Sequence, residues 1–539
     1  MPPTTNTREF SADVTIIGFG PTGATLAALL GDHGLAVTVI DRLDDLYPHP
    51  RAAGIDHEAL RILQKAGVAD AMRDNISPYR PSEYLGEAGQ LIQRIDSAPP
   101  PHRLGWHPNY VFDQPMLERL LRAKVQSLPN VNVLLGTEVQ KVDQDGSSCH
   151  IAALDNRTRQ PIELTSRYVV ACDGGASPTR TSLGIGLEDH GFHEPWLVVD
   201  VQVSDEAAAR LPQTQVQYCD PRGPATYIVL LGNLRRWEIQ LDDTDVPTGT
   251  EVMDEQVWTY LSRWVTPEEA EIRRAAAYTF HALTAKEWQQ ERVLLAGDAA
   301  HMTPPFMTQG MVQGLRDADN LAWKLARVVN GSPAALLETY EAERRPHVVQ
   351  TTTRAIELGR VICERDPAAA RKRDVDLLAA QGGRVVTRLR QDSIPSLVSG
   401  LLATDTPGAG EMLPQPRVMD VSGQEVLFDE VVGRSFFIVT TEQGMTERPS
   451  QPGAELDART YVFGTKDQAL HWLDERTAAV SEDAALIEQW LESKQARYAL
   501  VRPDKYVYGT AADRQSFDRL LTEAAARLGA PSLQRHEAL

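Results

Sequence analysis

Cysteine is scarce in this chain. Only four of 539 residues are cysteine, and no two of them stand in a CxxC pair: Cys149, Cys172, Cys219 and Cys363. Dithiol redox chemistry and structural zinc sites both need ligands at short spacing, so the sequence predicts neither, nor any other bound metal. Isolated free thiols suit a reducing compartment, and we expect a cytoplasmic protein.

Long apolar runs and an excess of basic residues are also missing. No apolar stretch is long enough to span a bilayer, and the N-terminus carries no apolar signal core. The chain has 54 Lys and Arg against 74 Asp and Glu, a net charge of -20. Nucleic acids and anionic membranes select basic surfaces, so we expect neither as a partner. A length of 539 residues predicts two or three domains.

Residues 18–23 (Gly-Phe-Gly-Pro-Thr-Gly) are the first of three motifs that bear on chemistry. They follow a β-branched run that predicts a buried strand, and they precede an apolar stretch that predicts a helix. Gly18 permits a tight turn, Gly20 lets the backbone approach a pyrophosphate, and Gly23 lets the helix pack close to the strand. A second predicted strand ends at Asp41, where a ribose-binding acid is expected. The pattern predicts a dinucleotide-binding unit, and a plain glycine turn in another βαβ unit is the alternative.

The second motif, residues 172–180, places Asp173 and Gly174 at a turn after a predicted buried strand. An Asp-Gly turn is common in proteins, so this motif carries weight only beside the others.

The third motif, residues 295–301, ends a predicted strand at Asp298. The proline pair at Pro304 and Pro305 follows, and a helix is predicted to begin near Gly310.

The three motifs, in this order and at this spacing, resemble those of the flavin-dependent aromatic hydroxylases of the para-hydroxybenzoate hydroxylase type. The nearest resemblance is to the 3-(3-hydroxyphenyl)propionate hydroxylases, on residues 50–61, 171–177 and 293–301. The likeness covers most of the chain and implies a single-component FAD monooxygenase.

The resemblance implies a bound FAD and a transient NADH or NADPH. Asp298 would bind the ribityl hydroxyls, and the N-terminus of the helix at Gly310 would face the flavin, whose reduced form is anionic. The predicted cofactor-binding residues are Gly18, Gly20, Thr22, Gly23, Asp41, Arg42, Arg51, Gln114, Asp173, Gly174, Asp298, Pro305, Gly310 and Met311.

Two residues depart from the family pattern. The family has Gly-Gln-Gly-x-Asn at the start of the helix, and this chain has Thr308 in place of the first glycine and Val312 in place of the asparagine. We expect these changes to affect the local backbone and the binding of the flavin.

The predicted fold is α/β, with a Rossmann-like FAD-binding domain, a mostly antiparallel β-sheet substrate domain and, by the resemblance, a thioredoxin-like C-terminal domain. The expected parts are the FAD-binding domain at 1–189, the substrate domain at 190–284, the rest of the FAD-binding domain with a helical region at 285–404, and the C-terminal domain at 411–539. Residues 76–110 are expected to contribute to the substrate site. The C-terminal part has no cysteine, so we expect a scaffolding or homodimer role there.

In the resembled enzymes NAD(P)H reduces FAD, O2 adds at flavin C4a, and the hydroperoxide transfers a hydroxyl to a phenol. The expected substrate is therefore a small aromatic, best a phenolic acid such as 3-(3-hydroxyphenyl)propionate. A larger aromatic polyketide or antibiotic is one alternative, and a flavin-binding protein that does not hydroxylate is another.

No motif identifies the group that removes the phenol proton. The candidate catalytic residues are His57, Tyr218 and His281. A guanidinium suits a substrate carboxylate, and the candidates for that contact are Arg103, Arg222, Arg235 and Arg236.

Overall fold

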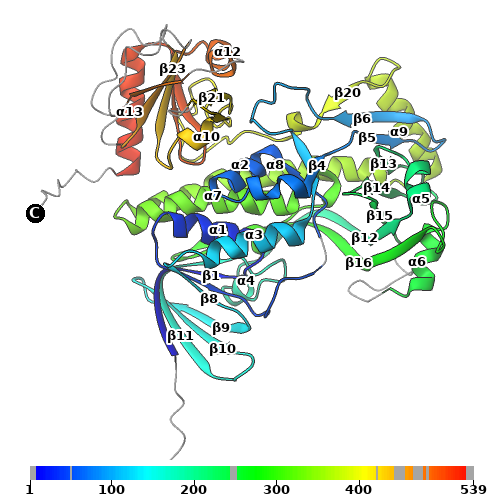
Figure 1. The fold of residues 1–539 in the computed structure, drawn as a ribbon, viewed down its shortest axis with the longest axis horizontal. Helices are drawn as coiled ribbons and strands as arrows, with labels where there is room; N and C mark the ends of the chain where they lie inside the picture. Colours follow the sequence, from blue (N-terminus) through cyan, green and yellow to red (C-terminus); the bar gives the residue numbers. More distant parts are fainter. Residues whose placement is uncertain are drawn as a thin grey trace, which may run out of the picture.

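The structure is a computed structural model that describes residues 8–48, 51–242, 252–419, 423–441, 456–464, 477–480 and 485–529. Over these ranges it is a mixed α/β fold with sheets of eight, nine and five strands and two smaller sheets (Figure 1). Within the described ranges, no helix is long and apolar enough to cross a membrane.

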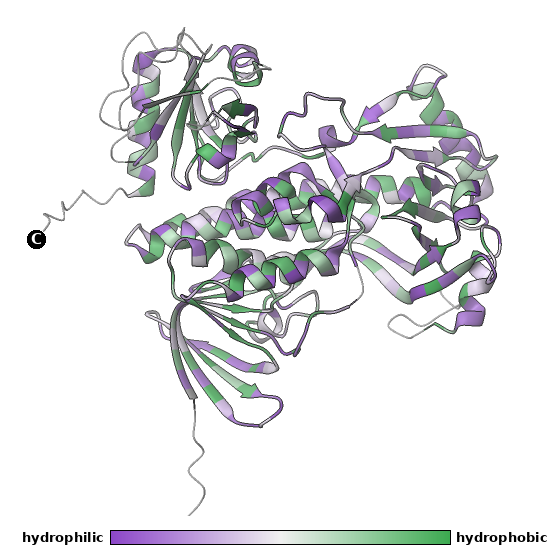
Figure 2. Ribbon diagram, viewed as in Figure 1, coloured by the Kyte–Doolittle hydropathy of each residue, from purple (hydrophilic) through white to green (hydrophobic). Residues whose placement is uncertain are grey.

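The eight-stranded sheet has a parallel centre in the order β18-β11-β1-β2-β8. Its central strands are short apolar runs that are buried on both faces, as parallel sheets require. The antiparallel hairpin β9–β10 extends from β11 and contains both hydrophobic and hydrophilic residues (Figure 2). The strands are β1 (Arg8–Ile17), β2 (Val37–Ile40), β8 (Val131–Leu134), β9 (Thr137–Gln144), β10 (Cys149–Asp155), β11 (Pro161–Ala171), β17 (Gln289–Gln290) and β18 (Val293–Leu295).

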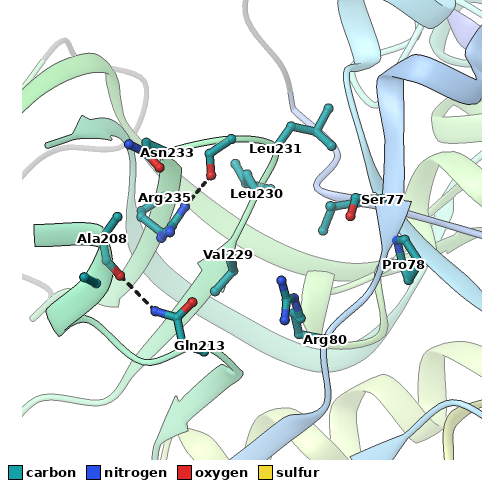
Figure 3. Close-up of a pocket in the computed structure, with 13 residues that line it drawn as sticks. Ser77, Pro78, Arg80, Ala208, Gln213, Val229, Leu230, Leu231, Asn233 and Arg235 are labelled. Atoms are coloured by element: carbon teal, nitrogen blue, oxygen red, sulfur yellow. Dashed lines mark hydrogen bonds between the residues drawn. The ribbon is translucent and has the colours of Figure 1, made fainter. Parts of the chain in front are cut away.

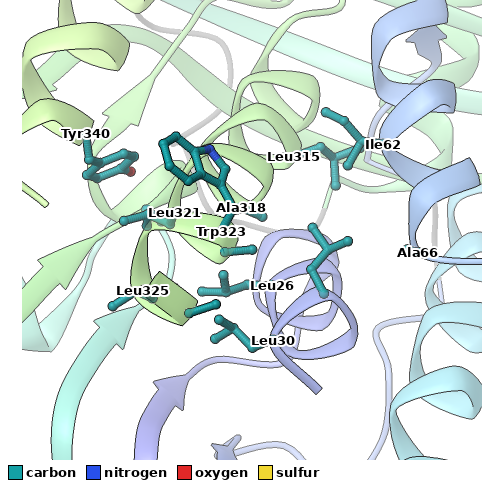
Figure 4. Close-up of a cluster of buried hydrophobic side chains, with 14 of the residues drawn as sticks. Leu26, Leu30, Ile62, Ala66, Leu315, Ala318, Leu321, Trp323, Leu325 and Tyr340 are labelled. Atoms are coloured by element: carbon teal, nitrogen blue, oxygen red, sulfur yellow. The ribbon is translucent and has the colours of Figure 1, made fainter. Parts of the chain in front are cut away.

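Four helices pack over this sheet: α1 (Pro21–Asp32), α2 (His57–Lys65), α3 (Gln114–Gln126) and α7 (Gly310–Val329). Helix α1 is buried along most of its length because α3 and α7 both lie against it. Leu26 and Leu30 of α1, Ile62 of α2 and Leu315 and Leu325 of α7 belong to one apolar cluster (Figure 4). This core fixes the start of α1 and the start of α7 relative to each other.

The nine-stranded sheet has the order β19-β16-β12-β15-β14-β13-β5-β6-β20 and is mostly antiparallel. Its strands β5 and β6 come from the 76–110 segment, which joins through a parallel pairing of β5 with β13. The strands are β5 (Ser82–Leu85), β6 (Leu91–Asp96), β12 (Leu187–Val203), β13 (Gln215–Tyr218), β14 (Ala225–Val229), β15 (Leu234–Gln240), β16 (Ala270–Ala285), β19 (His301–Met302) and β20 (Thr387–Leu389).

The two faces of this sheet have different surroundings. Val199, Trp237 and Ala277 lie on the outer face, in an apolar cluster with α5 (Asp205–Arg210) and α6 (Asp254–Leu261). Trp196 and Phe280 lie on the opposite face, which we call the inner face. Because successive side chains on a strand alternate, these contacts assign the neighbouring residues of the central strands to one face, between the register shifts of β12 and β16.

The remaining elements connect these layers. A small sheet, β3-β7-β4, links the two large ones, and the long helix α8 packs beside the inner face. These elements are β3 (Gly54–Asp56), β4 (Ile76–Pro78), β7 (Asn109–Phe112), α4 (Pro178–Ser182), α8 (Glu338–Ile362), α9 (Pro367–Ala380), and the 3-10 turns η1 (Asp70–Asn75), η2 (Gly297–Ala299), η3 (Pro305–Met307), η4 (Ala334–Leu336) and η5 (Arg390–Ser393).

The C-terminal unit is a mixed five-stranded sheet in the order β25-β24-β23-β26-β27, with helices beside it (Figure 1). Its elements are β21 (Arg417–Met419), β22 (Glu425–Leu427), α10 (Phe428–Val431), β23 (Phe437–Thr441), β24 (Arg459–Phe463), β25 (Thr477–Val480), α12 (Leu486–Ser493), β26 (Tyr498–Val501), β27 (Val507–Ala511) and α13 (Arg514–Leu528).

The C-terminal unit is held to α7 and α8 by buried charges. Arg502 lies 2.7 Å from Glu343 and 2.6 Å from Asp504, and Lys324 lies 2.7 Å from the same Glu343 carboxylate. All four side chains are at most 1% exposed. Such a network is stable only with every partner present, so the unit is part of one folded body with the helices.

Candidate functional site

The glycine turn after β1 requires its glycines. Gly18 has φ +104°, and a Cβ there would lie 2.3 Å from the carbonyl oxygen of Cys172. A Cβ at Gly23 would lie 2.0 Å from the Gly18 carbonyl oxygen. A Cβ at Gly20 would meet no atom within 4 Å, so bare backbone faces open space there. This is the arrangement that lets a backbone approach a phosphate closely.

Helix α1 begins at this turn, with Gly20 at its N-cap. No side chain caps it and its first turn has no acidic residue. Its first N–H groups have no partner within the helix, so the helix end favours an anion.

Asp41 holds the glycine turn. Its Oδ2 accepts a 2.7 Å hydrogen bond from the Phe19 N–H, and its Oδ1 accepts one from the Leu43 N–H at 2.8 Å. Arg122 supports the turn from the other side and donates to the Phe19 carbonyl at 3.1 Å. Arg42 is exposed beside it. The predicted ribose contact of Asp41 stays a prediction.

Arg180 joins the second motif to the third. Its guanidinium donates to the carbonyls of Gly175 and Ala299, both at 2.9 Å. Asp173 accepts from the Ser177 hydroxyl at 2.5 Å and from the Thr179 N–H at 3.1 Å, so its carboxylate shapes the turn that presents Arg180. Asp173 therefore stabilises this turn, and the predicted cofactor contacts of Asp173 and Gly174 stay predictions.

The Gly297–Asp298 turn is fixed by α7 and by α1. Asp317 of α7 accepts a 3.0 Å hydrogen bond from the Gly297 N–H. Thr22 of α1 packs between Gly297 and Gly314, where an added Cβ would meet its Oγ1 at 2.6 and 2.2 Å. The Thr22 side chain is thus a packing contact between the first and third motifs.

Asp298 lies exposed at this turn. No described residue hydrogen-bonds to its carboxylate, although Arg51 is close enough to act on its charge. An exposed carboxylate acceptor beside two helix N-termini fits a ribityl chain.

Gln114 positions the Arg51 segment. Its side-chain carbonyl accepts from the N–H groups of Arg51 and Ala52 at 2.9 and 2.7 Å, and its amide donates to Glu118 at 2.9 Å. The direct cofactor contact that we predicted for Gln114 stays a prediction, and the structure gives it this supporting role. Arg51 itself is exposed, with its guanidinium 4.7 Å from the Tyr47 ring centroid.

Thr308, which replaces the first glycine of the family pattern, has a left-handed backbone conformation. Thr308 has φ +57° and ψ 32°, a conformation that is unfavourable for a β-branched side chain. It precedes Gln309, the N-cap of α7, which has no side-chain capping bond. The glycine that the family uses here meets the same backbone requirement at lower cost.

The departure at Val312 places an apolar side chain in the core. Val312 is fully buried in the cluster that contains α1 and α7. Gly310 opens α7, Met311 is partly buried against the same cluster, and Pro305 begins η3 just before the helix.

Two of the three candidate catalytic residues lie on the outer face of the nine-stranded sheet. Tyr218 is on the outer face, where its ring lies 5.4 Å from that of Trp264. His281 alternates with the inner-face residue Phe280, and its Nδ1 lies 2.8 Å from the Nδ1 of His193 near the surface. Both residues project from the face opposite Trp196 and Phe280, and their catalytic roles stay predictions.

His57, the third candidate, is partly buried close to cationic side chains. It opens α2 one turn before Arg61, which pairs with Asp429 of the C-terminal unit at 2.5 Å. Burial, together with the nearby Arg316 and Arg61 charges, lowers the pKa of His57 to about 4. A group with so low a pKa is a weak base at neutral pH, and the catalytic role of His57 stays a prediction.

The four candidate arginines are distributed over the molecule. Arg103 pairs with Glu411 at 3.1 Å and Arg222 pairs with Asp220 at 2.9 Å. Arg235 is buried on the outer face. Only Arg236 is on the inner face, and it forms a two-pronged pair with Asp200 at 2.6 and 2.9 Å.

A charged group on the inner face was missed by the sequence reasoning. Arg236 also donates to the Arg51 carbonyl at 2.7 Å, and Arg274 lies 3.7 Å from Asp200 and hydrogen-bonds to Tyr278. Glu238 follows Arg236 on the same face. The alternation of Arg236, Glu238 and Gln240 with the apolar Trp237 and Ile239 was the signal that could have revealed this polar face.

Glu238 is buried without a partner. It is 6% exposed, and within the described part of the chain nothing hydrogen-bonds to its carboxylate. Burial raises the pKa of Glu238 to about 7, although the Arg236 charge opposes this. The carboxylate therefore changes its protonation state near neutral pH.

Glu238 lies on the inner face between the Arg51 segment and the turn before α7, both of which we predicted to contact the cofactor. Its neighbour Arg236 reaches the Arg51 carbonyl. On the other side, Gln240 pairs in register with Trp196, whose ring packs 5.7 Å from Phe306 of η3. The inner face thus spans from the Arg51 segment to the turn before α7.

Comparison with known proteins identifies the cofactor. The model described as "FAD binding domain" matches residues 11–355, and "HcaD C-terminal domain" matches residues 410–527. The glycine turn, the two uncapped helix ends and the exposed Asp298 carboxylate fit FAD.

The chain is 38% identical over 522 residues to a protein named as a probable NADH-specific resorcinol 4-hydroxylase of Rhodococcus jostii strain RHA1, covering 96% of this chain and 95% of that protein. It is 34% identical over 514 residues to a 3-(3-hydroxy-phenyl)propionate/3-hydroxycinnamic acid hydroxylase of Burkholderia cenocepacia strain HI2424, covering 92% and 93%.

Solved structures share the fold. The flavin-dependent monooxygenase PieE, solved with FAD and substrate, superposes with a TM-score of 0.79 at 20% identity, covering 97% of this chain and 100% of that chain. The anhydrotetracycline hydroxylase OxyS of Streptomyces rimosus gives 0.75 at 24% identity, with the same coverage. With the family model and the full-length relatives, these findings establish that the chain belongs to the FAD-dependent aromatic hydroxylases.

Proposed function

We propose that this hydroxylase uses NADH and O2 to hydroxylate a small phenol with a substituent meta to its hydroxyl group. The two relatives described above are named for resorcinol and for a 3-hydroxyphenyl acid, and both compounds have this ring pattern. FAD, when bound, supplies electron transfer from NADH and the activation of O2.

We place the phenol at the inner face of the nine-stranded sheet. The single observation that carries this placement is the buried, unpartnered Glu238 carboxylate between the Arg51 segment and Phe306. The Glu238 carboxylate has no hydrogen-bond partner among the described residues, so it is available to a ligand hydroxyl.

Glu238 is the residue that we propose takes the phenol proton. Hydroxylation needs an electron-rich ring, and a phenol whose proton is shared with a base is richer in electrons. A base with a pKa of about 7 is well matched to neutral pH. Arg236 and Arg274 stabilise the negative charge on the ring oxygen or on Glu238 itself.

The charge balance favours a neutral second substituent. Arg236 and Arg274 both face Asp200, at 2.6 and 3.7 Å, so their charges are already partly compensated. A substrate carboxylate would compete with Asp200 and would lie close to Glu238. We therefore propose a dihydroxybenzene of the resorcinol type ahead of the 3-hydroxyphenyl acid that the sequence alone suggested.

Exclusion of water protects the activated oxygen from loss as hydrogen peroxide. Trp196, Phe280 and Phe306 form an apolar aromatic wall beside the charged group, with ring centroids 5.7 to 6.3 Å apart. These rings supply the dry side of the site.

A substrate panel tests the proposal. Resorcinol, 3-(3-hydroxyphenyl)propionate and a fused-ring phenol are compared for coupled product, with NADH consumption and hydrogen peroxide measured in parallel. If resorcinol gives the most product per NADH consumed, the proposal is supported. If 3-(3-hydroxyphenyl)propionate gives the most, the substrate is instead the phenolic acid. Coupling only with the fused-ring phenol contradicts it. FAD binding without any product would favour a non-catalytic flavoprotein.

We also propose that the C-terminal unit is thioredoxin-like and that the protein forms a homodimer. The order of its strands, with two parallel and two antiparallel pairings, supports the former. Light scattering of the purified protein tests the latter.

A further inference from the structure

Tyr79, the residue after β4, carries a hydroxyl group that has no role in the function proposed above. Pro78 and Arg80, on either side of it, line a separate pocket of about 400 Å³ together with Val229 of the outer face (Figure 3). Because successive side chains of an extended chain alternate, Tyr79 points the other way, toward the inner face. Its N–H donates to the Asn109 carbonyl at 2.8 Å, which fixes the backbone at this point.

The packing of the Tyr79 ring agrees with this direction. The ring belongs to one apolar cluster with Ala53 and Ile228. Ile228 pairs in register with Arg236, and residues that are paired across two strands lie on the same face. Tyr227, the neighbour of Ile228, belongs instead to the outer-face cluster. The Tyr79 ring therefore lies over the inner face, beside Arg236.

The Tyr79 hydroxyl and the Glu238 carboxylate share this part of the inner face. Glu238 is the next inner-face residue of β15 after Arg236, and its partner Thr226 is the next inner-face residue of β14 beside Ile228. The charges of Glu238 and Arg236 both act on the Tyr79 hydroxyl. Within the described residues, neither Tyr79 nor Glu238 forms a side-chain hydrogen bond. The two groups are thus neighbours that are not bonded to each other.

Arg390 holds the Tyr79 ring in place. Its guanidinium carbon lies 4.5 Å from the ring centroid, a cation–π contact, and its Nη2 donates to the Ser82 hydroxyl at 2.6 Å. Burial raises the pKa of Tyr79, so the hydroxyl keeps its proton at neutral pH. The inner face therefore has a fixed hydrogen-bond donor in addition to the Glu238 acceptor.

We propose that the Tyr79 hydroxyl donates a hydrogen bond to the second hydroxyl group of the phenol and so selects a dihydroxybenzene. The inference rests on the proposed function, in which Glu238 takes the proton of the first hydroxyl. A ring with two hydroxyl groups supplies a partner to both side chains at once. A ring with an apolar substituent leaves the Tyr79 hydroxyl buried and unpaired, which disfavours that ligand.

Ligand binding to the oxidised holoenzyme tests this contact without turnover. Resorcinol and 3-methylphenol have the same ring pattern, and only resorcinol has a second hydroxyl group. Titration followed by flavin absorbance gives a dissociation constant for each. Tyr79→Phe should weaken resorcinol binding about tenfold and leave 3-methylphenol binding within about twofold, because only resorcinol loses a hydrogen bond. A purely structural role of the ring would affect both ligands alike.

Tyr84→Phe is the matched control. Tyr84 of β5 is 2% exposed, and its hydroxyl also forms no hydrogen bond within the described part of the chain. Strands β13 and β14 separate it from Glu238 of β15. This variant should leave both dissociation constants unchanged. In turnover, kcat/KM for resorcinol should fall in Tyr79→Phe and not in Tyr84→Phe.

Three outcomes overturn the inference. The first is equal weakening of both ligands in Tyr79→Phe, and the second is a selective loss of resorcinol binding in Tyr84→Phe instead. The third is unchanged resorcinol binding in Tyr79→Phe, and if the wild type then still hydroxylates resorcinol, the proposed function stands without this contact. If the wild type binds resorcinol through Tyr79 but forms no hydroxylated product, the proposed function fails and the contact stands. A wild type that binds neither ligand contradicts both.

Discussion

Arg316 Nη2 lies 2.6 Å from Asp56 Oδ2, and the same guanidinium reaches Glu58 at 2.7 Å and the Gln309 side-chain oxygen at 2.8 Å. Tyr506 of the C-terminal unit hydrogen-bonds to the other oxygen of Glu58. One buried arginine on α7 thus connects the N-cap of its own helix, the start of α2 and the C-terminal unit.

Replacement of this arginine tests that connection. Arg316→Met leaves Asp56 and Glu58 buried without a cation, and we expect the free energy of unfolding to fall by about 3–5 kcal/mol. Because Gln309 loses its support at the start of α7, FAD should also dissociate more readily. Denaturant unfolding and FAD titration measure the two effects.

Arg316→Lys is the matched control. It keeps the charge but loses the forked geometry, so its effects should be smaller. Equal stability of Arg316→Met and the wild type would refute the role of this arginine.

Replacement of Asp298 tests the predicted contact of the third motif with FAD. Asp298→Ala removes an exposed acceptor that no described residue uses, so the folded state should lose less than about 0.5 kcal/mol. FAD affinity should fall about tenfold or more through lost ribityl hydrogen bonds. The readouts are the melting temperature of the apoprotein and the FAD dissociation constant. Unchanged FAD affinity would mean that the third motif is misplaced.

The Glu238 carboxylate predicts a specific pH dependence of activity. A carboxyl group acts as a base only in its ionised form. The value of kcat/KM should therefore rise with pH through an apparent pKa of about 7. Glu238→Gln should remove this limb and lower kcat/KM about 100-fold or more. If the variant keeps both the limb and the rate, Glu238 is not the base.

The same carboxylate predicts a pH dependence of stability. The folded pKa is raised from 4.5 to about 7, so the folded state prefers the protonated form. Its contribution is complete below about pH 4.5 and is lost as pH rises through 7, by up to about 3 kcal/mol. In Glu238→Gln the free energy of unfolding should vary less over this pH range than in the wild type. An identical pH dependence in the two proteins would contradict the raised pKa of Glu238.

Thr308 predicts a stabilising substitution. Its φ of +57° suits glycine, so Thr308→Gly should raise the free energy of unfolding by about 1 kcal/mol. Thr308→Ala, which keeps a Cβ, should gain less. Denaturant midpoints compare the three proteins, and a loss of stability in the glycine variant would show that the threonine contacts matter more than its backbone.

The sequence predicted best where a short stretch sets its own geometry. Gly18 and Gly23 meet a backbone requirement within the turn itself, so their pattern could be recognised in the sequence, although Gly18 also lies against the distant carbonyl of Cys172. The sequence says least where the surroundings of a side chain depend on which surfaces pack together. Tyr218 and His281 lie on strands that the sequence located, but the face that each presents is decided by α6 and by Phe306.

Distant pairings were equally invisible in the sequence. Asp56 and Arg316 are 260 positions apart, and Glu58 and Tyr506 are 448 apart. Nothing in the local residue pattern around any of them marks the partner.

The buried charges beneath the C-terminal unit limit how this protein can evolve by recombination. A chain that exchanged its last part for an unrelated domain would leave Glu343 facing Lys324 without the arginine that now shares its charge. A successful exchange would have to bring both an arginine and an aspartate to the places of Arg502 and Asp504. The C-terminal unit is therefore expected to be inherited together with the catalytic part, as one lineage rather than as an interchangeable module.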